Sequence, residues 1–145
     1  MQQKILTADG KKDWQRDDPT VNREFPYRNW LRTWGAFCVD VDSIMFTSDG
    51  NDIRPYALVD ITMGDLFFED IKEGYLNAII GRYFGRDSQG KIQKKICELL
   101  HIRGYLLLFT NDMLGFWVYS FTDEKWKKFT KDAWRLNLER IKSLT

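Results

Sequence analysis

Two aspartates on consecutive β-strand patterns are the residues of this sequence best placed to do chemistry together. Asp42 ends the alternating stretch FCVDVD, Asp60 lies inside the apolar stretch YALVDIT, and the turn cluster SDGND separates them. A hairpin turning near Gly50 places Asp42 opposite Asp60 to within one residue of register, and directly opposed Cβ atoms lie about 4.5–5.5 Å apart. Two half-buried carboxylates at that distance repel each other, and both become costly to ionise.

A divalent cation with oxygen ligands would relieve this repulsion. Mg²⁺ typically takes one or two carboxylates from a protein and completes its shell with water and substrate phosphates. The spacing therefore indicates a metal site at Asp42 and Asp60. The alternative is structural, with both acids at strand ends in water or paired with Arg54 or Lys72.

The segment FCVDVDSIMF at residues 37–46, followed by PYALVDIT at residues 55–62, resembles the core of PD-(D/E)XK nucleases, the restriction-endonuclease-like superfamily. That family has an acid on one strand of a hairpin and an (Asp/Glu)-x-Lys motif on the next. A helix follows, and then a hairpin of apolar strands, for which YLLLFTN and GFWVYSF are suitable here. The resemblance covers residues 24 to 121 and implies an α/β fold, a small mixed β-sheet flanked by helices.

The resemblance also implies roles for individual residues. Asp42 matches the first metal-binding acid and Asp60 the second, while Asp40 is a substitute or helper on the same side of its strand. Glu24 matches the helical glutamate that some members add to the metal shell, and is otherwise a surface acid. The implied cofactor is Mg²⁺ or Mn²⁺, which would lower the pKa of a bound water and neutralise charge on a phosphate. The implied function is a metal-dependent nuclease that hydrolyses DNA phosphodiester bonds.

Threonine stands where this family has its lysine. In the motif DIT, Thr62 can hold a water by a hydrogen bond but has no positive charge. Lys72 on the next helix is the first candidate to supply that charge, although it is about 10 Å along the helix; otherwise it is a solvated partner for Glu69 or Glu73. The missing lysine therefore leaves a second function open, a nuclease-like domain that has lost catalysis and binds nucleic acid or a protein partner.

The elements that must position these residues alternate between helical and strand periodicity. We expect a helix from Pro26 to Trp34, strands over 37–46 and 53–62, helices ending near Phe84 and Leu100, strands over 105–110 and 116–121, and a last helix from Thr122 onward. Asp65 is the expected cap of the helix that follows the second strand. Residues 1–22 form a polar lead with turn signals and no apolar periodicity, which leaves a single nuclease-like domain over residues 23–145.

Length and composition limit the classes of protein to which this chain can belong. The chain has 145 residues, 43% of them hydrophobic, and a formal net charge of +1, which suits one domain with a sizeable core and argues against an indiscriminate nucleic-acid coat protein. No apolar run approaches the roughly 18 residues of a membrane span, and Met1–Gly10 lacks the apolar stretch of a secretory signal. We therefore expect a cytoplasmic protein with no membrane partner. Its expected partners are DNA and, because aromatic residues favour interfaces, a second copy of the chain.

The cysteines and the single histidine are poor candidates for chemistry. Cys38 and Cys97 lie in apolar patterns and are expected to be small core hydrophobes. His101 follows two leucines and is expected at a helix C-terminus, where a cation suits the helix dipole. A basic cluster in the expected last helix is either a solvated face or a phosphate contact: Trp126, Lys127, Lys128 and Lys131.

Overall fold

A computed structural model describes residues 41–86 and 88–145, together with short pieces of the earlier chain at residues 4–6, 12–14, 26–27, 30 and 33–35. The earlier pieces include an antiparallel pair of strands, β1 (Lys4–Leu6) and β2 (Lys12–Trp14). The sequence does not predict this pair, because strands of three residues are too short to show an alternating pattern.

The main sheet has five strands in the order β3-β4-β5-β6-β7. Their bounds are β3 (Ser43–Asp49), β4 (Asp52–Gly64), β5 (Arg103–Thr110), β6 (Phe116–Ser120) and β7 (Lys125–Phe129). Only β4 and β5 run parallel, and the other neighbouring pairs are antiparallel. Parallel strands need a long crossover, which here contains η1 (Phe68–Asp70), α2 (Glu73–Ile80), the π-helix η2 (Gly81–Arg86) and α3 (Gln89–Leu100), while α4 (Lys131–Ser143) ends the chain.

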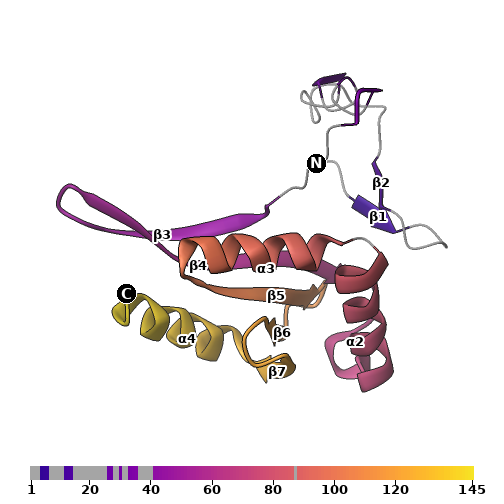
Figure 1. Ribbon diagram of the computed structural model, residues 1–145. Helices are drawn as coiled ribbons and strands as arrows, with labels where there is room; N and C mark the ends of the chain where they lie inside the picture. The colour runs from indigo at the N-terminus through magenta and orange to yellow at the C-terminus, as the bar shows by residue number, and fades with distance from the viewer. Residues whose placement is uncertain are drawn as a thin grey trace.

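Different helices cover the two faces of the sheet (Figure 1). On one face Leu58 and Leu106 pack against residues of α2, η2 and α3, and on the other Val59 and Leu107 pack against α4 through Trp134. Strand β4 is therefore buried on both faces over residues 56–60, which confirms the first part of the prediction from its apolar run. The prediction fails at the end of that run, because Ile61 is exposed. The arrangement confirms an α/β fold with a mixed sheet flanked by helices. Among the described helices, none combines the length and apolar character needed to cross a membrane.

The predicted last helix is wrong over its first part. Residues 125–129 form β7, and α4 begins only at Lys131, where the Thr130 hydroxyl accepts a hydrogen bond of 3.0 Å from the N–H of Ala133. The residues of β7 instead extend the sheet, with Trp126 opposite Tyr119. These pairings are tertiary and outweigh the local helix-start signal, so most of the basic cluster lies on an edge strand and not on a helix.

The predicted cap at Asp65 is also wrong. Helix α2 begins at Glu73, its N-cap residue is Lys72, and no side chain caps it. Asp65 instead accepts a hydrogen bond of 3.0 Å from the Tyr75 hydroxyl. This bond ties the loop after β4 to the first turn of α2, and His101 occupies the C-cap of α3 as expected.

Cys97 lies in the core as predicted, with 5% of its surface exposed. Burial raises the pKa of its thiol to about 11, and the charge of Glu98 acts in the same direction. In a Cys38→Ser background we expect Cys97 at pH 8 to react with a disulfide reagent about 100-fold more slowly in the folded protein than in urea, because the thiolate is the nucleophile. The absorbance of the thiol released from the reagent measures the reaction rate. Equal rates in the folded protein and in urea would contradict the burial of Cys97.

Candidate functional site

The β3–β4 hairpin brings Asp42 and Asp60 together. Ser43 pairs with Val59 in the antiparallel register. The residue before Ser43 and the residue after Val59 therefore form the next opposed pair. These residues are Asp42 and Asp60, as the position of the turn cluster predicts.

One backbone amide is shared by the two carboxylates. The N–H of Ile61 donates to Oδ2 of Asp42 at 2.9 Å and to Oδ1 of Asp60 at 3.2 Å. Both oxygens therefore lie around a single nitrogen. Two carboxylates this close repel each other when both are ionised, and a positive group beside them relieves that repulsion.

Asp60 is the buried member of the pair. Its side chain is 1% exposed on the β4 face beneath η2 and α3, whereas Asp42 is exposed. Oδ2 of Asp60 accepts hydrogen bonds from the Tyr83 hydroxyl at 2.8 Å and from Nε2 of Gln89 at 3.0 Å. Burial of an ionised carboxylate is costly unless it is hydrogen-bonded or paired, and these donors offset that cost while leaving Oδ1 directed toward the shared amide.

Tyr83 reaches Asp60 from the π-helical turn η2. Such turns are rare and occur frequently at functional sites. The Tyr83 ring stands edge-on to Phe84 with a centroid separation of 5.2 Å, and Gly90 on α3 leaves room for it, because a Cβ at that position would lie 2.7 Å from the ring. Burial raises the pKa of the Tyr83 phenol above its usual range, and the charges of Asp60 and Asp42 raise it further. The hydroxyl is therefore protonated and donates at physiological pH.

Gln89 belongs to the first turn of α3. It is 6% exposed, and Gln93, one turn later on the same side of the helix, is fully buried. Two glutamines four residues apart on the buried side of a lysine-rich helix are the signal that could have marked this surface. Neither Gln89 nor Tyr83 is predicted from the sequence, because glutamine and tyrosine at helical spacing are equally typical of a solvated or a core face.

Thr62 lies two residues beyond Asp60 on the same face of β4. It is half-buried and stands opposite Leu108 on β5. Side chains at i and i+2 of a strand share a face, so the Thr62 hydroxyl and the Asp60 carboxylate belong to one row. Thr62 contributes a neutral hydrogen-bonding group to that row.

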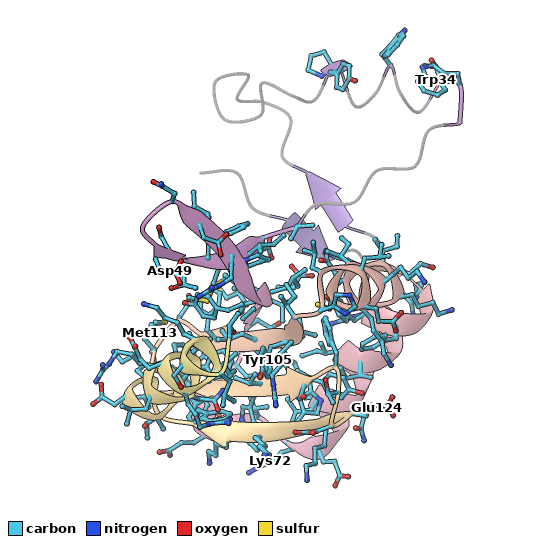
Figure 2. The ribbon with its side chains drawn as sticks, turned by 60° about the vertical axis from the view of Figure 1, so that its left-hand side comes forward. Trp34, Asp49, Lys72, Tyr105, Met113 and Glu124 are labelled. Atoms are coloured by element: carbon cyan, nitrogen blue, oxygen red, sulfur yellow. The ribbon has the colours of Figure 1, made fainter. Side chains whose placement is uncertain are left out.

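Lys72 lies at the far end of this region. It is exposed, and its Nζ is 3.5 Å from the carbonyl oxygen of Glu69. Helix α2 starts beside Gly64, where an added Cβ would contact the Tyr75 hydroxyl. Gly64 is about 13 Å from Asp60 at about 3.3 Å per residue of strand. Figure 2 shows Lys72 at the lower edge of the molecule, well away from Asp49 at the tip of the β3–β4 hairpin.

Two further predicted ligands, Asp40 and Glu24, lie outside the described residues. The residues that the structure does describe contain no group of three or more His, Cys, Asp or Glu side chains placed to hold a metal. Asp42 and Asp60 supply two carboxylates, which is the number that Mg²⁺ takes from many proteins, with water and phosphate as the other ligands. The donor set therefore fits an ion of this class.

A scan against protein-family models, a search of curated proteins and a search of solved structures find no match to this chain.

Proposed function

We propose that this protein is a metal-dependent nuclease that hydrolyses DNA phosphodiester bonds, with Mg²⁺ or Mn²⁺ held by Asp42 and Asp60. The observation that supports the proposal most directly is the Ile61 N–H, which both carboxylates share. A cation beside them would add to the hydrogen bonds that offset the burial of Asp60, which ends the buried run of β4 at residues 56–60. The resemblance of residues 37–62 to the PD-(D/E)XK core supports the same assignment.

Each residue of the site would have a distinct role in the hydrolysis. When bound, the ion supplies an activated water and offsets the negative charge of the phosphate. Asp42, which is exposed, and Asp60, which is buried, would bind it from the two strands of the hairpin. The Thr62 hydroxyl, on the same face as Asp60, would orient a water by a hydrogen bond.

A positive charge toward the phosphate must come from a residue other than Thr62. Lys72 is the candidate that the sequence indicates, at the start of α2. Arg86 is a second candidate, because it ends η2 three residues from both Tyr83 and Gln89, whose side chains contact Asp60. Arg86 is nearer to this cluster along the chain than Lys72, so substitution of each residue compares the two cations directly.

The proposal is tested with supercoiled plasmid and the full-length chain. We expect nicking with Mg²⁺ or Mn²⁺ and none with EDTA, and a rate at least about 100-fold lower in Asp42→Asn, since even outer-shell partners of a metal are worth 10–100-fold. Asp52→Asn is the matched control, because Asp52 is exposed on the same hairpin. Its carboxylate forms an ion pair with Arg54 at 3.4 Å. The variants Arg86→Gln and Lys72→Gln show which of the two cations contributes more to the nicking rate.

The second candidate function is a nuclease-like domain that binds nucleic acid or a protein partner without cutting. Thr62 is the observation that favours it, because the lysine that assists the attack of water is replaced by a neutral side chain. This function predicts a DNA mobility shift with no product under every ion. If no divalent ion supports cleavage of any DNA form and calorimetry detects no ion binding, the nuclease proposal is wrong.

A further inference from the structure

We infer that the solvent-facing side of α3 binds the phosphate backbone of duplex DNA through Lys91 and Lys95. The inference rests on the DNA substrate of the proposed function and names the surface that would hold it. It does not depend on how Asp42 and Asp60 would bind an ion.

Positive charge is concentrated in η2 and α3, although the chain as a whole is nearly neutral. Residues 81–100 contain five lysines or arginines and two acids, a net charge of +3, whereas the whole chain has +1. The preceding residues 60–73 contain five acids and one lysine, a net charge of −4. A polyanion is attracted to the first segment and repelled by the second, so the charge of α3 favours DNA as its partner.

Helix α3 has a buried side and a solvent-facing side. Gln89, Gln93 and Cys97, spaced four residues apart, are buried, whereas Lys91 and Lys95 are exposed. Residues four apart share one side of a helix and are separated by about 6 Å along its axis. Successive phosphates of one DNA strand are separated by about 3.4 Å along the duplex axis. A strand that runs along α3 therefore presents phosphates two nucleotides apart to the two lysines.

Two ion pairs of α3 bear on this surface. The Lys95 ammonium is 3.9 Å from the Glu98 carboxylate, and both side chains are largely exposed. Exposed ion pairs of this kind are weak, so Lys95 can exchange the carboxylate for a phosphate. Lys94 instead pairs with Glu124 at 3.4 Å, and we do not count it among the phosphate contacts. The Glu98 carboxylate would repel a phosphate bound at Lys95.

Helix α3 also carries a residue of the candidate site. Gln89, in its first turn, donates to Asp60 at 3.0 Å, and Lys91 follows two residues later on the solvent-facing side. An α-helix with its side chains is about 10–12 Å in diameter, so a phosphate at Lys91 would lie about that far from the carboxylate pair. About three nucleotides of one strand span this distance. A single duplex is therefore long enough to reach both lysines and the carboxylates.

The test is fluorescence anisotropy of a labelled DNA duplex titrated with the protein in EDTA, where a metal-dependent nuclease does not cut, at a series of salt concentrations. We expect Lys91→Gln and Lys95→Gln each to weaken binding at low salt. Each should also reduce the slope of log affinity against log salt concentration by about 0.9, the value for one lost phosphate contact. The loss should be equal for duplexes of different sequence, because phosphate contacts do not read bases.

Lys142→Gln is the matched control, because Lys142 is an exposed lysine on α4, which covers the opposite face of the sheet (Figure 1). Its slope should equal that of the unaltered protein. Glu98→Gln should instead strengthen binding, because it removes the negative charge beside Lys95. A folding defect would weaken binding, so tighter binding by this variant cannot arise from a loss of structure.

The outcomes separate this inference from the proposed function. Equal losses in Lys91→Gln and Lys142→Gln, or weaker binding by Glu98→Gln, would overturn the DNA surface on α3 and leave the nuclease proposal to the nicking assay. Absence of duplex binding by the unaltered protein would also overturn the surface. The expected changes in slope, together with no nicking under any divalent ion, would support the surface and contradict the nuclease proposal.

Discussion

Asparagine at position 60 should lower divalent-ion-dependent cleavage of DNA by at least about 100-fold while the chain remains folded. The substitution keeps the size of the side chain but removes the negative charge that would hold the cation. It also places an NH₂ group among the Tyr83 hydroxyl, the Gln89 amide and the Ile61 N–H, all of which are donors. Initial rates of plasmid nicking at saturating Mg²⁺ measure the effect.

The control for Asp60→Asn is Asp65→Asn. Asp65 also accepts a hydrogen bond from a tyrosine hydroxyl, but it is exposed and lies beyond the end of β4. This variant should cut DNA at the unaltered rate, and far-ultraviolet circular dichroism should show that both proteins are folded. Cleavage by Asp60→Asn at the unaltered rate would place the activity at a different site or in a contaminant.

Alanine at position 104 should lower the free energy of unfolding by about 1–3 kcal/mol, the usual cost of overpacking a core. A Cβ there would lie 2.5 Å from the sulfur of Cys97 and would overlap the ring of Phe121, and both side chains are buried. The carbonyl of Gly104 also accepts a hydrogen bond of 3.0 Å from the Phe121 N–H. The strand therefore cannot move away from the ring without losing this bond.

Urea denaturation measures the effect of Gly104→Ala on the free energy of unfolding. The dependence of this free energy on urea concentration is compared between the variants. Gly74→Ala is the control, because Gly74 lies in α2 and an added Cβ there meets nothing within 4 Å. Alanine should stabilise that helix by as much as about 1 kcal/mol. Equal stability of Gly104→Ala and the unaltered protein would mean that α3 does not pack on β5 as closely as these distances require.

The features that the sequence predicts well are those encoded within a short segment. The turn cluster around Gly50 and the apolar run before Thr62 determine the hairpin, and with it the opposition of Asp42 to Asp60. The mixed sheet follows from the spacing of the strand and helix patterns. These signals are local, so they can be recognised in the sequence without knowledge of the tertiary contacts.

The features that the sequence does not predict depend on contacts between distant segments. Strand β7 forms because its residues pair with β6, although Thr122 begins a stretch that is typical of a helix start. Tyr83 and Gln89 reach Asp60 only after the crossover returns over the sheet, at sequence separations of 23 and 29 residues. No short sequence motif indicates such contacts between distant segments.

The outer strands β3 and β7 carry features that oppose aggregation. The register of the β3–β4 pair shifts between Met45 and Phe46, where β4 has one extra residue, Tyr56, and such a bulge increases the twist of the pair at this edge of the sheet. The opposite edge, β7, presents the exposed lysines Lys125, Lys127 and Lys128, whose like charges repel the same strand of another molecule. Within the part of the chain that the structure describes, growth of the five-stranded sheet by intermolecular strand addition is therefore disfavoured at both edges.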